Sequence, residues 1–431
     1  MSVARLCIHQ ININNGDCAL IEVFNEANQV VGRVLLDGGN SDASRFVVPY
    51  LQTANVMNTV ALSHFHKDHY EGLEGMRNGE LRTTGYVDAG GYSLTNVVPQ
   101  SGIAPLGLNP LTANNITPPK PPSNAYLQAL KEGVMAGAPG PYVTTRGLPN
   151  LYPSQIGQSY TIATLMLDGA PVPIELKCVA ANAFNIAPNG TAPLPASRLA
   201  PGSLNPNNYS LAFVLSFGKF RYYTGGDIGG YDGFPCGNYL DQETGMAQAF
   251  QNMYPNSQSW NNGPNKAGHI CAIKASHHGS KCSNNSTFLR TTSPSAIITS
   301  AGSHRGWKLP AVPCLQRFAA DAIPLGENQG FFFTNLFNFG TGNESLTVAE
   351  NLFGNSAPTR QNTAAQNISM DFSYGDIEEP GAGHSYMIQV PLAFLANQQG
   401  TNILNVSAYE VYRKLSYADA GAKVGTYVCH K

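Results

Sequence analysis

The segment HFHKDH, residues 64–69, constrains the fold of this chain more than any other stretch of its sequence. It places three of the ten histidines of a 431-residue chain around one aspartate, directly after the short apolar run TVALS. Two further apolar runs end in similar chemistry, because FRYYTGG leads to Asp227 and CAIKAS leads to His277 and His278. Sites gather where the strands of a sheet end and loops begin. We therefore expect an α/β fold in which three strand ends converge on one site.

The spacing within HFHKDH suits two neighbouring metal ions. On an extended backbone the side chains of His64 and His66 project to the same side, whereas Asp68 and His69 lie past the turn. Imidazole and carboxylate ligands are typical of Zn²⁺, and Mn²⁺ and Fe²⁺ also accept them. We expect His64 and His66 to bind one ion and Asp68 and His69 to bind the second, while Asp227 bridges both.

The adjacent His277 and His278 complete the expected site, and the sequence leaves their separate roles open. One of the two is expected to bind a metal, and the other to act as an outer-sphere acid or a phosphate contact. Two ions that share a hydroxide lower its pKa and direct it at an electrophilic phosphorus or carbonyl carbon. Asp68, His277 and His278 are therefore the candidate catalytic residues.

Together these motifs resemble those of the metallo-β-lactamase superfamily. HFHKDH is followed by GGD at 225–227 and HHGS at 277–280. The branch with the ComEC-type competence protein and the phosphorylcholine esterases is most similar, because NNGDCALIE, LLDGGN (35–40) and NNYS (207–210) also match its pattern. The resemblance runs, with gaps, from about residue 3 to 325. It implies an αββα sandwich of two sheets with helices outside, and hydrolysis, commonly of phosphodiesters.

The sequence departs from the family pattern at two points. Many members carry another ligand histidine between the first motif and the bridging aspartate, but no histidine occurs from 70 to 268. The metal at His64 and His66 is therefore expected to have one protein ligand fewer. In addition, Leu309 stands where competence-type proteins tend to carry a histidine, and His304 is the candidate to replace it.

The pattern along the chain predicts one hydrolase domain over residues 1–325. Insertions are expected at about 92–206 and 230–267, and the first is rich in proline and glycine. Residues 326–431 are expected to form a C-terminal extension that packs on the core. Helices are predicted at about 44–53, at NAYLQALKEGV (124–134), and at SAYEVYRKL (407–415), where Ser407 and Glu410 match a capping box.

The eight cysteines are scattered and include no CxxC pair, so a cysteine-based zinc site is not expected. No apolar core of a secretory signal occurs at the N-terminus, and we therefore favour buried free thiols over disulfides. The same observation favours a cytoplasmic location, or export without a standard signal peptide.

Charge and hydropathy limit the partners that this chain can have. A net charge of −2 argues against an extended surface for duplex nucleic acid. No apolar run approaches the roughly 20 residues of a membrane span, so no membrane partner is expected. A small or single-stranded anionic substrate fits better, because a few polar and cationic residues lie within or near the motifs. Candidate substrate contacts are Lys67, Ser280, Lys281, His304 and Arg305, and Lys274 is a further cation beside them.

The favoured function is a metal-dependent hydrolase that uses a metal-bridging hydroxide. We expect a phosphodiesterase or nuclease acting on a small or single-stranded phosphodiester, with two divalent ions, preferably Zn²⁺. A second interpretation is hydrolysis of a lactone, β-lactam or thioester, since the same hydroxide serves there. A third is a non-enzymatic, effector-like binding protein on the same scaffold.

Overall fold

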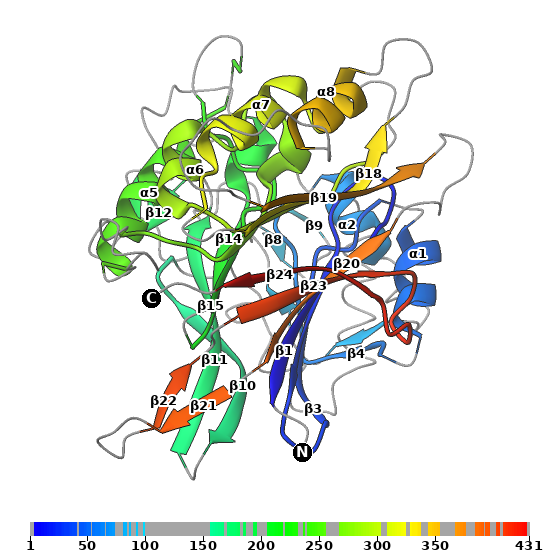
Figure 1. The fold of residues 1–431 in the computed structure, drawn as a ribbon, viewed down its shortest axis with the longest axis vertical. Helices are drawn as coiled ribbons and strands as arrows, with labels where there is room; N and C mark the ends of the chain where they lie inside the picture. Colours follow the sequence, from blue (N-terminus) through cyan, green and yellow to red (C-terminus); the bar gives the residue numbers. More distant parts are fainter. Residues whose placement is uncertain are drawn as a thin grey trace.

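The fold is given by a computed structural model that describes most of residues 4–428. Two large β-sheets pack face to face, with helices outside them (Figure 1), which confirms the predicted α/β sandwich. None of the described helices is long and apolar enough to cross a membrane. The longer segments outside the description are 74–80, 100–155, 187–192, 196–204, 256–266, 303–307, 338–343, 354–366 and 376–383.

The first sheet has eight strands in the order β24-β23-β20-β1-β2-β3-β5-β7. Its β1, β2 and β3 are antiparallel, whereas β3, β5 and β7 run parallel, so the carboxyl ends of β3 and β5 lie side by side. The strands are β1 (Arg5–Gln10), β2 (Ala19–Phe24), β3 (Val30–Leu36), β5 (Thr59–Ala61), β7 (Tyr86–Val87), β20 (Ser385–Pro391), β23 (Ala408–Lys414) and β24 (Ala422–Val428).

The second sheet has ten strands in the order β13-β12-β11-β14-β15-β16-β17-β18-β19, and β10 pairs with β11. From β15 to β19 neighbouring strands are parallel, so the carboxyl ends of β15 and β16 also meet. The strands are β10 (Ser159–Leu167), β11 (Ala170–Ala181), β12 (Phe184–Ile186), β13 (Pro193–Pro195), β14 (Ala212–Phe217), β15 (Phe220–Thr224), β16 (Ala272–Lys274), β17 (Ala296–Thr299), β18 (Asn328–Phe337) and β19 (Asn367–Gly375).

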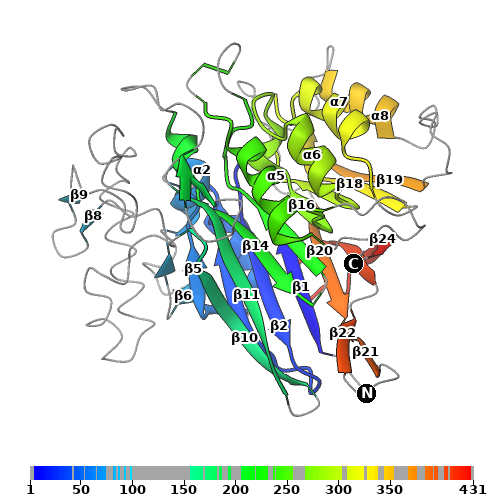
Figure 2. The same cartoon turned by 90° about the vertical axis from the view of Figure 1, so that its left-hand side faces the viewer.

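Helices α5 to α8 cover the outer face of the ten-stranded sheet (Figure 2). On the other side of the sandwich, α1 (Ala43–Leu51) lies against the eight-stranded sheet, where Tyr50 hydrogen-bonds His9. This α1 confirms the helix predicted at 44–53. The remaining helices are α2 (Lys67–Tyr70), α5 (Gln242–Met253), α6 (Ser286–Thr292), α7 (Val312–Asp321) and α8 (Glu344–Phe353), with 3₁₀ turns η3 (Pro206–Tyr209) and η4 (Ser276–Gly279).

Three two-stranded ribbons complete the described structure. They are β4 (Val56–Met57) with β6 (Arg82–Thr83), β8 (Tyr92–Ser93) with β9 (Val98–Pro99), and β21 (Ala393–Ala396) with β22 (Asn402–Asn405). The helix predicted at 124–134 lies outside the described residues.

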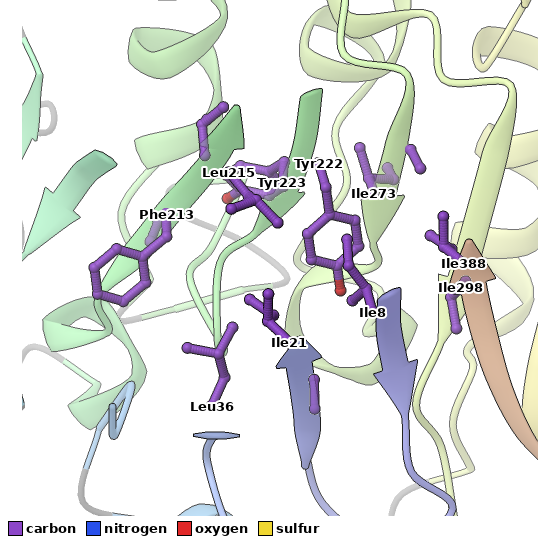
Figure 3. Packing of buried hydrophobic residues seen from close by; sticks show 14 of the residues in the cluster. Ile8, Ile21, Leu36, Phe213, Leu215, Tyr222, Tyr223, Ile273, Ile298 and Ile388 are labelled. Atoms are coloured by element: carbon purple, nitrogen blue, oxygen red, sulfur yellow. The ribbon is translucent and has the colours of Figure 1, made fainter. Parts of the chain in front are cut away.

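The core lies between the two sheets. Figure 3 shows Ile8 and Ile21 of one sheet facing Leu215 and Tyr222 of the other, and all four side chains are fully buried. Alternate residues of a strand point to opposite faces, so these positions share the inner face with their neighbours two residues away. Each buried side chain of this size stabilises the fold by roughly 1.5–3 kcal/mol. The sandwich is thus a stable frame for the strand ends.

The helix predicted at SAYEVYRKL is wrong, because residues 408–414 form β23 between β20 and β24. Tyr409 and Val411 are fully buried, whereas Glu410 between them is half-buried on the other face. This alternation has a period of two, which is typical of a strand. The Tyr409 hydroxyl donates to the carbonyl of Cys271 at 2.8 Å, in the opposite sheet. Tertiary packing therefore overrides the capping pattern.

Residues beyond 325 are part of both sheets. They contribute β18 and β19 to the ten-stranded sheet and β20, β23 and β24 to the other, and β20 pairs directly with β1. Within the first predicted insertion, residues 159–186 contribute β10, β11 and β12. The predicted domain boundary stays a prediction.

The expectation of free thiols holds for five buried cysteines, Cys7, Cys18, Cys178, Cys271 and Cys314, and is wrong for one pair. Cys236 and Cys282 form a disulfide, with Cα atoms 5.6 Å apart. The two residues lie 46 positions apart in the sequence and meet because their loops pack together, with Gly230 N–H donating to the Cys282 carbonyl. Sequence spacing alone carries no signal for such a long-range pair.

Candidate metal centre

The candidate site lies where strand ends from both sheets meet. β5 leads to Ser63 and His64, and α2 begins directly after His66. From the other sheet, β15 leads to Asp227, and β16 leads into η4 with its two histidines. The two sides are joined there, because Leu211 N–H donates to the Ser63 carbonyl at 2.8 Å. The fold thus brings the three sequence motifs together.

The carboxylate of Asp227 lies at the centre, and each of its oxygens is approached by two imidazole nitrogens. Oδ1 is 3.4 Å from Nε2 of His69 and 3.4 Å from Nε2 of His278. Oδ2 is 3.8 Å from Nε2 of His64 and 3.7 Å from Nε2 of His277. Two ligands of one tetrahedral zinc ion, each about 2.0–2.1 Å from it, lie roughly 3.3 Å apart. The spacing therefore suits one ion beside each oxygen.

We name the Oδ1 half of the centre the inner side. It consists of Asp68, His69, His278 and Oδ1 of Asp227. Asp68 Oδ2 lies 3.4 Å from Nε2 of His278 and 3.9 Å from Nε2 of His69. Both Nε2 atoms and Asp227 Oδ1 are buried and have no hydrogen-bond partner. Buried polar atoms almost always have partners, so these converging atoms fit a metal ion.

The histidines of the inner side are held from behind through their Nδ1 atoms. His69 Nδ1 lies 2.8 Å from Asp37 Oδ2, and His278 Nδ1 lies 2.9 Å from the Ser300 carbonyl. When Nδ1 carries the proton and donates it to these acceptors, the Nε2 lone pair faces the centre. Asp37 is itself fixed, because it accepts the backbone N–H and the hydroxyl of Ser63.

Asp17 also stands behind the inner side rather than within it. It is close enough to His69, His278 and Asp227 to be grouped with them as possible ligands. Its oxygens, however, lie 3.5 Å from His278 Nδ1 and 3.9 Å from His69 Nδ1, away from the converging Nε2 atoms. Gly16 makes this approach possible, because a Cβ there would lie 1.9 Å from the Asp68 carbonyl oxygen.

Sequence reasoning missed the roles of Asp17 and Asp37. The signal that could have found them is local, because each acid adjoins a glycine in a turn beside a strand, as Asp227 does. The sequence makes Lys274 a candidate phosphate contact, but in the structure this lysine is buried. Its Nζ donates to the Asp17 carboxylate and, at 3.0 Å, to the Gly226 carbonyl. Lys274 therefore balances the charge of Asp17 and joins the end of β16 to the loops that carry Asp17 and Gly226.

We name the Oδ2 half the outer side, which consists of His64, His66 and Oδ2 of Asp227. These three residues form the second group with the geometry of a metal site. His64 is buried, with Nδ1 3.1 Å from the Ser63 hydroxyl, and its Nε2 has no hydrogen-bond partner. His66 is half-buried. Each side thus has one half-buried member, His66 on the outer side and Asp68 on the inner side, but both imidazoles of the inner side are buried.

The pKa values of the two sides differ in direction. Burial lowers the pKa of His64 well below its usual value, and the neighbouring imidazoles add to this. Burial also opposes the charged form of His69, but Asp227, Asp37 and Asp68 outweigh it and raise its pKa well above the usual value. Burial likewise opposes the charged form of His278, but Asp227 and Asp17 outweigh it and raise the pKa of this histidine. The carboxylates of the inner side thus supply a strong field for a cation.

The two histidines of η4 have an uncommon backbone. His277 has φ 49° and ψ 48°, and His278 has φ 52° and ψ 25°, so both are left-handed. This conformation costs roughly 1–2 kcal/mol per residue for side chains other than glycine. The turn is held by hydrogen bonds from His277 N–H to the Gly226 carbonyl and from Ser280 N–H to the His277 carbonyl. The turn lets adjacent side chains reach different oxygens of Asp227.

His277 and His278 therefore have different surroundings. His278 is a member of the inner side, whereas His277 belongs to neither group of possible ligands. Burial lowers the pKa of His277 to about 4, although Asp227 opposes the shift, and 14% of its side chain is exposed. Its ring stacks on Tyr239, with centroids 5.5 Å apart, and its Nε2 lies 3.1 Å from Nδ2 of Asn207.

The candidate substrate contacts are only partly placed. Lys67 is exposed on α2 and pairs with Glu71 at 3.4 Å, and Lys281 is exposed after η4. Ser280 is buried, and its hydroxyl accepts the N–H of Cys282 at 3.3 Å. His304 and Arg305 lie outside the described residues.

Comparisons with known proteins place few limits on this chain. No protein-family model matches it, and no curated protein does. Among solved structures, it is similar to the crystal structure of human tRNase Z, short form, with 10% sequence identity and a TM-score of 0.28. The match covers 69% of this chain and 93% of that one. A likeness this remote says nothing about the activity of this chain.

Proposed function

We propose that this protein is a binuclear metallo-hydrolase that cleaves phosphodiesters. The observation that carries the proposal is the arrangement around Asp227, where Nε2 of His69 and Nε2 of His278 lie 3.4 Å from Oδ1 and Nε2 of His64 lies 3.8 Å from Oδ2. The order of the sequence motifs supports the resemblance to the metallo-β-lactamase superfamily. The ComEC-type branch stays a prediction.

The residues of the two sides have distinct proposed roles. Asp68, His69 and His278 would hold one divalent ion, and His64 and His66 would hold the other. Asp227 would bridge them through its two oxygens. Asp37 and the Ser300 carbonyl would orient His69 and His278 from behind, and Asp17 adds negative charge 3.5 Å from Nδ1 of His278. Zn²⁺ is the preferred ion because imidazole nitrogen dominates the ligand set. When bound, the two ions would lower the pKa of a shared water and polarise the electrophile.

Charge favours an anionic substrate. The centre contains four carboxylates, from Asp17, Asp37, Asp68 and Asp227, and one ammonium, from Lys274. With neutral imidazoles these groups sum to a charge of minus three, which two divalent ions would turn into plus one with a shared water and into zero with a shared hydroxide. The ions themselves attract a phosphodiester monoanion, whereas a neutral lactone has no net charge for them to attract. The substrate is expected to be small or single-stranded.

The test combines elemental analysis with a substrate panel. Protein purified in metal-replete buffer is analysed for bound ions and assayed on bis(p-nitrophenyl) phosphate, nitrocefin and a lactone. We expect close to two ions per chain and turnover of the phosphodiester alone, abolished by a chelator and restored by Zn²⁺ or Mn²⁺. The matched control is the Asp68→Ala, His69→Ala variant, which should keep the fold and lose one ion.

Two outcomes would contradict the proposal in different ways. Two bound ions with turnover of only the lactone or nitrocefin would move the function to carboxyl chemistry on the same centre. Less than one ion per chain under metal-replete conditions would favour a non-enzymatic binding protein on this scaffold.

A further inference from the structure

A polar pair borders the outer side of the metal centre and belongs to no ligand group. Tyr239 stacks on the ring of His277 with an interplanar angle of 29°. Nδ2 of Asn207 lies 3.1 Å from the Tyr239 hydroxyl and 3.1 Å from Nε2 of His277. Since His277 Nε2 is 3.7 Å from Asp227 Oδ2, the pair stands one side chain away from the outer side.

The position of Asn207 is fixed by its own turn. Asn207 is buried in η3, where its backbone N–H donates to the side chain of Asn205 at the start of the turn. The neighbouring Asn208 accepts the backbone N–H of Leu240 at 2.9 Å, which fastens this turn to the segment that carries Tyr239. Asn207 is therefore held in place before any substrate arrives.

The position of Tyr239 is fixed by the disulfide. Its backbone N–H donates to the Cys236 carbonyl at 3.2 Å, and Cys236 is bonded to Cys282, four residues after His278. The covalent link thus joins the segment bearing Tyr239 to the loop that follows the two histidines. A donor held on both sides loses little conformational entropy when it contacts a ligand.

The hydroxyl of Tyr239 is available as a hydrogen-bond donor. Burial raises its pKa, and the nearby charge of Asp227 raises it further, so the phenol keeps its proton at neutral pH. Its oxygen accepts from Asn207, which leaves the O–H proton uncommitted. The side chain of Asn205 also hydrogen-bonds this hydroxyl, and both amide contacts lower its pKa, as hydrogen bonds donated to the phenol oxygen do. The side chain of Tyr239 is half-buried rather than sealed.

We infer that Tyr239 is a substrate-binding residue that donates its O–H to a non-bridging oxygen of the phosphoryl group, and that Asn207 is its positioning residue. The inference rests on the proposed function and adds a protein donor to the outer side. A phosphodiester has two non-bridging oxygens, so one can face the metal centre while the other faces Tyr239. The hydrogen bond would be charge-assisted, because the acceptor is anionic.

The test is Tyr239→Phe in the metal-loaded, full-length protein, since Phe keeps the ring that stacks on His277. We expect kcat/KM for bis(p-nitrophenyl) phosphate to fall roughly 10- to 100-fold, as for a lost hydrogen bond to a charged group. Inorganic phosphate, measured by calorimetry, should bind more weakly by a similar factor. Ion content should stay at the wild-type value.

The control is Tyr231→Phe. This half-buried tyrosine lies on the same segment, but its ring is 5.0 Å from the guanidinium of Arg317 rather than at the metal centre. It should leave both kcat/KM and phosphate binding within twofold of wild type.

The outcomes separate this inference from the proposed function. Unchanged turnover and unchanged phosphate affinity in Tyr239→Phe would overturn the inference while the function stands. If the wild-type protein cleaves no phosphodiester, phosphate binding still decides, because a selective loss in Tyr239→Phe supports the subsite and equal affinity overturns it. Loss of bound ions in the variant would also overturn it, since the residue would then support the metals.

Discussion

The inner and outer sides of the centre share one aspartate and yet differ in how they are supported. On the inner side His69 and His278 are buried, and each donates from Nδ1 to a fixed oxygen of Asp37 or Ser300. On the outer side His66 is only half-buried, and the adjoining neighbours are the neutral side chains of Asn207 and Tyr239. Under the proposed function, the supported imidazoles beside Oδ1 of Asp227 would retain metal, and the neutral side chains beside Oδ2 would meet the substrate.

The largest expected difference is between two neighbouring residues, His278 and His277. His278→Ala should lose the inner ion, and its kcat/KM should fall roughly 10³-fold. The reason is that a metal acting as a Lewis acid stabilises the transition state by several kcal/mol. His277→Ala should keep both ions and lose roughly tenfold, through the support that its ring gives to Tyr239. Elemental analysis and steady-state kinetics on both variants measure the contrast.

Equal losses of metal in the two variants would break the comparison. His277 would then be a ligand of the outer side, and it would replace the histidine that the sequence lacks between 70 and 268. A variant at a remote histidine, His269→Ala, would control for general effects on the fold, since its Nδ1 lies 2.9 Å from the carbonyl of Thr292 in the protein interior.

An intermediate effect, on the pH dependence of stability, is expected when Glu243 is replaced. This residue supports the loop behind the inner side. Its carboxyl group is buried and accepts the backbone N–H groups of Asn284 and Asn285. Burial raises its pKa to about 7, although these hydrogen bonds favour the charged form. A raised pKa in the folded state means that stability is greatest below the unfolded value near 4.5 and is lost as pH rises through 7.

The measurement is urea unfolding of the metal-free protein at pH 5 and pH 8, for wild type and Glu243→Gln. Between pH 5 and pH 8 the free energy of unfolding should fall by at most about 3 kcal/mol more in wild type than in the variant. Parallel changes in the two proteins would show that Glu243 does not titrate in this range, and that the loop behind the inner side is held without regard to its charge.

The smallest effect is expected from Asp37, which acts on a metal only through His69. Asp37→Asn keeps the shape of the side chain but removes the charge behind the imidazole. We expect the affinity for the inner ion to fall roughly 10- to 100-fold, as for other partners of metal-binding histidines. The control is Asp419→Asn, at a carboxylate that caps the 415–421 turn. Competition with a chromophoric chelator measures both, and equal affinities would remove the support that distinguishes the inner side.

The sequence predicted the convergence of the site better than its surroundings. The apolar runs before His64 and Asp227 have the β pattern of strands, and both runs form strands whose ends meet. Asp17 and Asp37 were not assigned a role, because a single acid in a glycine turn is usual in any loop-rich protein. Only the parallel pairing of β3 with β5 places Asp37 beside His69.

Long-range packing explains the other differences. Residues 408–414 carry both a capping pattern and an alternating apolar pattern, and pairing with β20 and β24 decides for the strand. Lys274 has the charge expected of a substrate contact. In the structure it is buried and forms an ion pair with Asp17, which lies in a loop of the other sheet. The strands that pair with residues 408–414 and the carboxylate that pairs with Lys274 both lie far away in the sequence or in the other sheet. Neither the strand nor the ion pair could therefore be predicted from the local sequence.

The left-handed turn at His277 and His278 has a consequence for how such a chain would change over generations. Two bulky residues in this conformation weaken the fold, and glycine or asparagine at either position would relieve the cost. Most random substitutions destabilise a protein, so ones that stabilise it are readily accepted once a function is lost. A chain that had become an inert scaffold would drift toward the relaxed turn. A strained pair of histidines at this turn is therefore what the proposed catalytic function would have to preserve.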